Sequence, residues 1–177
     1  PGIVVVDIQG ASDFLRGHIP GAASTDFGKS GWREENAEKV PGMLPAKLDK
    51  LAAHIGSLGV DNSSHVVLVA PGGSYNDMGW ATRIYWTFKV LGHDNLSILN
   101  GGMAAWTKDK ANPLETGASK VAAKTFTVHP RLDMVATVAD VKASKAKGVL
   151  LVDNRPEDQF VGINGSPAAK ENGTLPG

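Results

Sequence analysis

The stretch Ile3-Val4-Val5-Val6-Asp7 decides the fold, because it is a continuous run of β-branched residues that ends in a carboxylate. A run that is apolar on both faces is typical of a strand buried within a parallel sheet. A second run of this kind, Val66 to Ala70, predicts another central strand, and the loop Pro71 to Ser74 follows it. A shorter strand is expected at Leu96 to Leu99.

Patterns with helical spacing separate these runs. Pro45 to Leu58 carries leucines and an isoleucine at helical spacing, and a glycine, the residue type that commonly ends helices, follows it at Gly59. A further helix is expected from about Asp77 to Leu91, before Gly92, and a short one from Ser12 to Arg16 with Ser12 as N-cap. Strands that alternate with helices predict the α/β class, with a mostly parallel sheet flanked by helices. The aromatic residues of the long helix are expected in the core rather than in a stacking platform: Trp80, Tyr85, Trp86 and Phe88.

Composition excludes several classes of protein and site. The 18 basic residues are balanced by 18 acidic ones, and both kinds are scattered, so neither a nucleic acid nor an anionic membrane surface is expected as a partner. The apolar runs are far shorter than the ~20 residues of a membrane-spanning helix. The sequence has no cysteine, which excludes a disulfide scaffold and a cysteine nucleophile but does not identify the cellular compartment. The five histidines have no metal-ligand spacing, so neither a metal nor another cofactor is expected.

The composition divides the chain into three parts. Residues 1–110 form the predicted domain, and residues 111–128, rich in Lys, Ala, Thr, Pro and Gly, are interpreted as a linker. In the remainder, 129–177, Thr137 is expected to cap a helix that ends at Gly148, and Val149 to Asp153 is expected to form a strand.

The third part repeats the first. Leu150 to Asn154 matches Val4 to Ile8, and farther on Gly173-Thr174-Leu175-Pro176-Gly177 matches Gly17-His18-Ile19-Pro20-Gly21 after an insertion. We therefore expect a second, incomplete copy of the first domain. The counterpart of the Ala70 loop would lie about as far beyond Gly177 as Ala70 lies beyond Gly21.

Several motifs in this order resemble the tandem-rhodanese sulfurtransferases, the family of thiosulfate and 3-mercaptopyruvate sulfurtransferases. The resemblance covers essentially the whole chain, and the motifs are Val5-Val6-Asp7, Gly17 to Ala22, Trp86 to His93, Asn100 to Trp106 and Val152-Asp153-Asn154-Arg155.

The resemblance implies a rhodanese-like fold and transfer of sulfane sulfur from an anionic donor to a thiol or cyanide acceptor. The sulfur would travel on a cysteine persulfide in the second domain, because in this family the first domain lacks the active cysteine. The remainder of that second domain is therefore an expected partner, and this chain alone is expected to be inactive. The resemblance also implies that Arg155 and His18 contact the donor.

Each candidate residue also has a structural interpretation. Arg155 could instead bridge surface carboxylates such as Glu157 or Asp158, and His18 could be a turn residue before Pro20. Asp7 and Asp153 are expected to bond backbone N–H groups at strand ends rather than to act as catalytic carboxylates. The same choice arises for Gly72-Gly73-Ser74, which is interpreted as a bare turn rather than as an anion cradle.

The sequence is also compatible with two other functions. A rhodanese-like module without cysteine could serve protein binding, with its cleft as the recognition surface. A phosphatase on a related fold would need the same absent cysteine nucleophile. A cysteine in the predicted second loop would favour the sulfurtransferase, and a loop without cysteine would favour the binding module.

Overall fold

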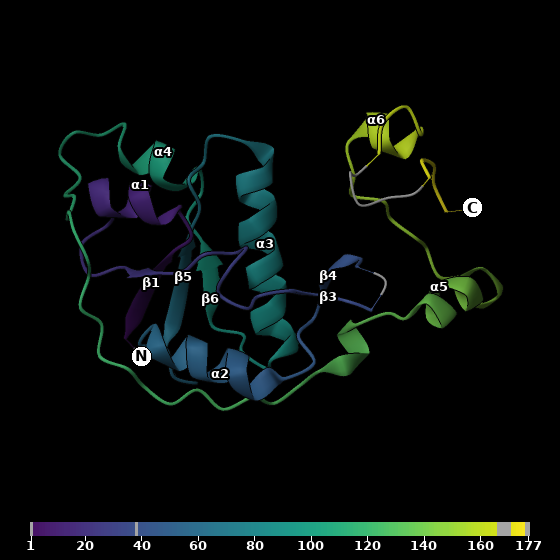
Figure 1. Ribbon diagram of the computed structural model, residues 1–177, viewed down its shortest axis with the longest axis horizontal. Helices are drawn as coiled ribbons and strands as arrows, with labels where there is room; N and C mark the ends of the chain where they lie inside the picture. Colours follow the sequence, from purple (N-terminus) through teal and green to yellow (C-terminus); the bar gives the residue numbers. More distant parts are fainter. Residues whose placement is uncertain (1, 38, 166–170, 176–177) are drawn as a thin grey trace. The chain divides into compact units, whose positions relative to one another are not determined.

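The computed structural model describes residues 2–37, 39–165 and 171–175, and it contains two compact units (Figure 1). The first unit consists of Pro1–Glu34 and Gly42–Arg131, and the second of Glu35–Pro41 and Leu132–Gly177. Among the described residues no helix is long and apolar enough to cross a membrane.

The first unit is built on a four-stranded parallel sheet with the strand order β2-β1-β5-β6. The strands are β1 (Ile3–Asp7), β2 (Ala23–Ser24), β5 (His65–Val69) and β6 (Leu96–Ile98). Strand β1 is central, since Val6 is opposite both Ala23 of β2 and Leu68 of β5. The predicted mostly parallel α/β fold is confirmed. A separate two-stranded hairpin is formed by β3 (Glu34–Glu35) and β4 (Pro41–Met43).

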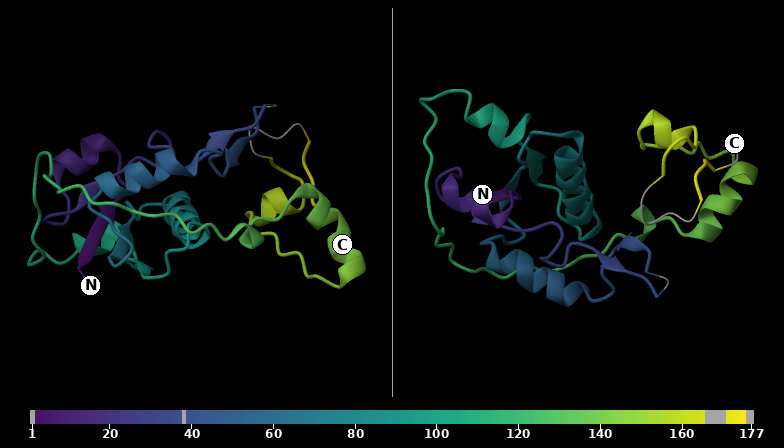
Figure 2. Two further views of the ribbon diagram at one scale, coloured as in Figure 1. Left: turned by 90° about the horizontal axis from the view of Figure 1, so that it is seen from below. Right: turned by 45° about the horizontal axis from the view of Figure 1, so that its top comes forward.

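The described residues of the first unit also form four helices: α1 (Ala11–Arg16), α2 (Leu48–Ser57), α3 (Tyr75–Val90) and α4 (Gly102–Trp106). Helix α3 runs alongside β5 and β6 in Figure 1, and the left view of Figure 2 shows this helix nearly end-on. The glycines expected to end helices do so with positive φ, at 78° for Gly59 and 88° for Gly92. The expected cap at Ser12 is wrong, because α1 begins at Ala11 and its N-cap is Gly10, whose carbonyl accepts the first helical bonds. Helix α2 begins at Leu48, later than the predicted Pro45.

The core lies between the sheet and helices α2 and α3. Val6, Leu68, Ile55, Ile84 and Phe88 are all completely buried in it. The prediction that the aromatic residues of the long helix are core is right for Phe88, and Tyr85 and Trp86 are half-buried. It is wrong for Trp80, which is 41% exposed because it sits in the second turn of α3, where it stacks on Phe27 instead of the sheet.

Residues 111–131, which we call the strap, lie along the first unit and are bonded to it at several points. Lys124 N–H donates to the carbonyl of Gly56 in α2 at 2.9 Å, and the side chain of Asn62 exchanges two hydrogen bonds with the backbone of Thr127. Phe126 is 5% exposed and joins the core. In Figure 1 the strap is the green trace that leaves α4 and passes α2. The segment interpreted as a linker therefore packs against the first unit.

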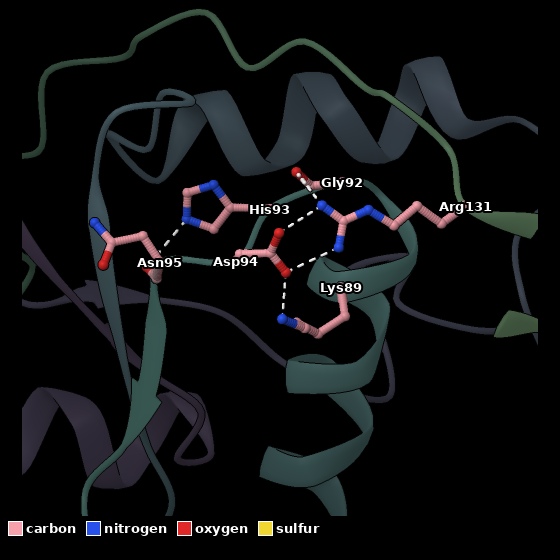
Figure 3. Close-up of polar contacts among 6 residues, drawn as sticks. All are labelled: Lys89, Gly92, His93, Asp94, Asn95 and Arg131. Atoms are coloured by element: carbon pink, nitrogen blue, oxygen red, sulfur yellow. Dashed lines mark hydrogen bonds and ion pairs between the residues drawn. The ribbon is translucent and has the colours of Figure 1, made fainter.

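The end of the strap is anchored by an ion-pair cluster (Figure 3). Arg131 Nη1 donates to Asp94 Oδ1 at 2.8 Å, and Lys89 pairs with the same carboxylate. Hydrogen bonds from Arg131 and then Lys89 hold the pKa of Asp94 well below its usual range. In the backbone, Arg131 N–H donates to the carbonyl of Val90 at 2.7 Å. These contacts fix the last residue of the first unit against the C-terminal end of α3.

The second unit contains short helices: η1 (Leu132–Met134), α5 (Val138–Ser144), η2 (Lys145–Lys147) and α6 (Glu157–Phe160). The predicted cap is confirmed, since Asp140 N–H donates to Thr137 Oγ1 and the Thr137 N–H donates to Asp140. The predicted strand from Val149 to Asp153 is wrong, because this segment pairs with no strand among the described residues. Its apolar side chains are largely exposed, with Leu150 at 84% and Val152 at 71%.

Candidate functional site

The loop after β5 occupies the position where open α/β sheets bind ligands, outside the carboxyl ends of the strands. Ser74 caps α3, and its hydroxyl accepts a bond from Asp77 N–H. The Asp77 carboxylate in turn accepts the N–H groups of Gly73 at 2.8 Å and of Ser74 at 3.0 Å. An oxyanion bound at a helix N-terminus needs such N–H groups. Here the Asp77 carboxylate already accepts the hydrogen bonds of these N–H groups.

A glycine turn closes the same loop from the other side. The carbonyls of Ala70 and Pro71 accept hydrogen bonds from the N–H groups of Met103 and Ala104. A Cβ on Gly72 would lie 2.1 Å from the Gly101 carbonyl oxygen, and a Cβ on Gly102 would lie 2.1 Å from that of Ala70. The two segments are in direct backbone contact. This supports the interpretation of Gly72 to Ser74 as a structural turn.

Asp7 ends β1 and is completely buried. Its Oδ1 accepts the N–H of Gln9 at 2.8 Å, as expected for a strand-end carboxylate, and its Oδ2 accepts Gln9 Nε2 at 2.9 Å. Burial raises the pKa of Asp7, while the bonds from Gln9 and the nearby His18 ring act in the opposite direction. The carboxylate is turned into the protein, which suits a structural role.

His18 is also completely buried, in the turn before Pro20. Its Nδ1 donates to the carbonyl of Phe14 at 2.8 Å, and the ring stacks on Phe14 with centroids 3.8 Å apart. Its Nε2 has no hydrogen-bond partner among the described residues and lies 3.7 Å from Glu115 Oε2 of the strap. A small molecule could reach this ring only if the strap moved.

Arg155 follows Asp153 in the second unit and is held by it. Arg155 Nε lies 3.0 Å from each Asp153 carboxylate oxygen, and Nη2 donates to Oδ2 at 2.6 Å and to the Gly173 carbonyl at 2.8 Å. Asp153 raises the pKa of Arg155, and Arg155 lowers that of Asp153. The ion pair is therefore with Asp153, not with Glu157 or Asp158. Nη1 makes no hydrogen bond with any described residue.

Arg155 lines an open hollow of about 870 Å³ within the second unit. Leu151, Phe160 and Leu175 provide apolar parts of its wall. The Arg155 side chain is 41% exposed, so the guanidinium edge with Nη1, which bonds none of the described residues, is available to an anion. The arrangement can hold an anionic group, but it contains no nucleophile that could attack sulfur.

Sequence reasoning missed several residues that shape the loop after β5 and the surroundings of Asp7 and His18. Helical spacing marks Asp77 only as the start of a helix, although Ser74 followed three residues later by a carboxylate is the pattern of a capping box. The roles of Gln9 and Glu115 depend on contacts through space and have no sequence signal of their own. Within the described part of the chain, no group of three or more His, Cys, Asp or Glu side chains could hold a metal ion.

Comparisons with known proteins identify relatives of this chain. The family model described as "Rhodanese-like domain" matches residues 1–109. The chain is 29% identical over 180 residues to a thiosulfate sulfurtransferase of Bos taurus, with 96% of this chain and 58% of the bovine protein covered. It is 31% identical over 169 residues to a human 3-mercaptopyruvate sulfurtransferase, with 93% and 54% covered.

Among solved structures, a 3-mercaptopyruvate sulfotransferase of Escherichia coli matches with a TM-score of 0.66 and 27% identity. The match covers 84% of this chain and 58% of that protein. The chain thus spans little more than half the length of these relatives. A family match over most of the chain, together with the parallel sheet and the relatives, shows that it belongs to the rhodanese-like domain family.

Proposed function

We propose that this chain is part of a sulfurtransferase that moves sulfane sulfur from an anionic donor, thiosulfate or 3-mercaptopyruvate, to a thiophilic acceptor such as a thiol or cyanide. The chemistry requires a thiolate that attacks the outer sulfur of the donor, releases the rest of the donor, and holds a persulfide until the acceptor attacks it. None of the 177 residues is a cysteine, so the persulfide would form on a part of the second copy outside this chain.

The observation that carries the proposal is the position of Arg155 in the hollow of the second unit. Asp153 holds one edge of the guanidinium, and the other edge, with Nη1, is left for the donor. Because the donors of the related enzymes are anions, a fixed guanidinium is a suitable contact. A donor contact at His18 stays an untested prediction, since the strap and Phe14 cover its ring.

The rival function, a rhodanese-like module that binds a protein without catalysis, also has an observation in its favour. The first loop holds no cysteine, and the amides of Gly73 and Ser74 are bonded to Asp77. Nearby, Tyr75 is 73% exposed and Trp80 is 41% exposed, and exposed aromatic residues are common at protein interfaces. The coding sequence after Gly177 separates the two functions, because only the sulfurtransferase requires a cysteine loop there.

The direct test is a thiosulfate-to-cyanide transfer assay on this chain and on the longer protein. We expect no turnover above buffer from the chain alone, because no side chain in it can form a persulfide, and turnover from the longer protein. Turnover by the chain would overturn the proposal.

In the longer protein, Arg155→Ala should lower kcat/KM by about tenfold to a hundredfold, as expected for loss of a charge-assisted contact. Arg155→Lys should restore only part of it, because lysine keeps the charge but not the planar fork. Full activity of Arg155→Ala at low donor concentration would remove Arg155 from the donor site.

A further inference from the structure

The two copies of the sequence repeat share a pattern of hydrogen bonds, which is visible only in the structure. In the first copy, Asp7 Oδ1 accepts the backbone N–H of Gln9 at 2.8 Å. In the second copy, Asp153 Oδ1 accepts the backbone N–H of Arg155 at 2.9 Å. Both carboxylates therefore form the same local turn with the residue two positions later, although only Asp7 belongs to a strand.

The side chain of that later residue makes the same two further bonds in both copies. Gln9 Nε2 donates to Asp7 Oδ2 at 2.9 Å and to the carbonyl of Gly17 at 3.2 Å. Arg155 Nη2 donates to Asp153 Oδ2 at 2.6 Å and to the carbonyl of Gly173 at 2.8 Å. Gly17 and Gly173 each begin the Gly-x-x-Pro-Gly motif of their copy, and the last two residues of the second motif lie outside the described residues.

Chain length alone does not explain this agreement. The second copy has an insertion between Arg155 and Gly173, so the chain between donor and acceptor is much longer than between Gln9 and Gly17. The same glycine carbonyl is nevertheless bonded in each. A bond that persists across such a difference in loop length indicates a requirement for that geometry.

We propose that Gln9 and Arg155 are equivalent positioning residues, each of which ties the end of the repeated apolar segment to the start of the Gly-x-x-Pro-Gly turn. An amide is sufficient for this bridge, since Gln9 makes it with one nitrogen. The positive charge of Arg155 is additional to the bridge, and so is Nη1, to which none of the described residues is bonded. This role does not depend on the proposed sulfur transfer.

The surroundings of Gln9 and Arg155 fit the proposal that both residues form the bridge and that only Arg155 adds a charge to it. Gln9 is 8% exposed and neutral, and it bridges beside the buried Asp7. The Arg155 side chain is 41% exposed, so its charge is not buried and remains available at the hollow. The first copy keeps the bridge alone, and the second copy has a bridge and a cationic edge that bonds no residue in the described part of the chain.

The test uses the chain as described, labelled with ¹⁵N and ¹³C, and compares Arg155→Gln with Arg155→Ala. The backbone order parameter of Gly173 should be near the rigid value of about 0.85 in the wild type and in Arg155→Gln, and should fall below about 0.6 in Arg155→Ala. The Gly173 carbonyl resonance should move in Arg155→Ala and stay in Arg155→Gln. Lys142→Gln, an exposed change in the same unit, is the control and should change neither.

Rescue by glutamine distinguishes the bridge from the charge. If Arg155→Ala leaves Gly173 as rigid as in the wild type, if Arg155→Gln behaves like Arg155→Ala, or if Gly173 is already mobile in the wild type, the positioning role is wrong. Gln9→Ala should have the matching effect on Gly17 and none on Gly173. In the activity assay above, Arg155→Gln tests the donor contact alone, so either idea can fail without the other.

Discussion

Strand β1 and the segment 149–153 carry nearly the same sequence pattern, yet only β1 forms a strand. Strand β1 pairs with β2 on one side and β5 on the other, and Val6 is completely buried there. Its repeat counterpart Val152 is 71% exposed, and the segment 149–153 pairs with no described strand. An apolar β-branched run can form a strand, but it does so only where neighbouring strands accept its hydrogen bonds.

The largest expected effect comes from truncating the same position in both copies. Val6→Ala should destabilise the first unit by about 2 kcal/mol, because it removes buried methyl groups and leaves a cavity in the core. Val152→Ala should change stability by less than about 0.5 kcal/mol, because the side chain is exposed. Urea unfolding of both variants measures the difference, and equal losses would show that the second segment is also packed.

A second effect concerns how the strap covers the first unit. Gly56→Ala would place a Cβ 2.4 Å from the carbonyl oxygen of Lys124, so the strap must shift, with a cost of about 1–3 kcal/mol. Gly79→Ala is the matched control in helix α3, where a Cβ would meet nothing within 4 Å. It should be neutral or slightly stabilising. If both variants had the same midpoint of thermal unfolding, the close packing of the strap would be wrong.

A smaller effect should appear between pH 7.5 and 5.5, where histidines titrate, and only in the first unit, because all five histidines precede residue 132. Burial lowers the pKa of His93, and burial also lowers that of His54. As the pH falls below about 6.5, the unfolded chain therefore takes up protons before the folded chain does. The free energy of unfolding decreases toward acid pH for this reason, and it does not change above neutrality. His93→Gln should flatten this dependence between pH 7.5 and 5.5. A steeper acid loss in His93→Gln than in the wild type would contradict the sign of the shift.

Much of the first unit could be predicted from local sequence. The β-branched runs identified β1 and β5, and Gly59 and Gly92 marked the ends of α2 and α3 because those positions require positive φ. The position of Trp80 could not be predicted, since helical spacing says which residues share a face but not how far the sheet extends under the helix. The same limit applies to the strap, which has little periodicity and is held by scattered bonds.

The candidate site was predictable only in part. The resemblance singled out Arg155, but its partners Asp153 and Gly173 emerge from folding, because the bond to Gly173 spans a long insertion. The covered position of His18 likewise depends on Glu115 of the strap, far away in sequence. Contacts that join distant segments leave no local pattern to recognise.

Hydrogen exchange of the backbone amides tests the comparison of the two copies most directly. The amides of Val4 to Asp7 should exchange only by global unfolding of the first unit, and those of Leu150 to Val152 should exchange at nearly the rate of an unfolded chain. That result would confirm that one repeated segment is a paired strand and the other is not. Comparable protection in the two segments would contradict the account.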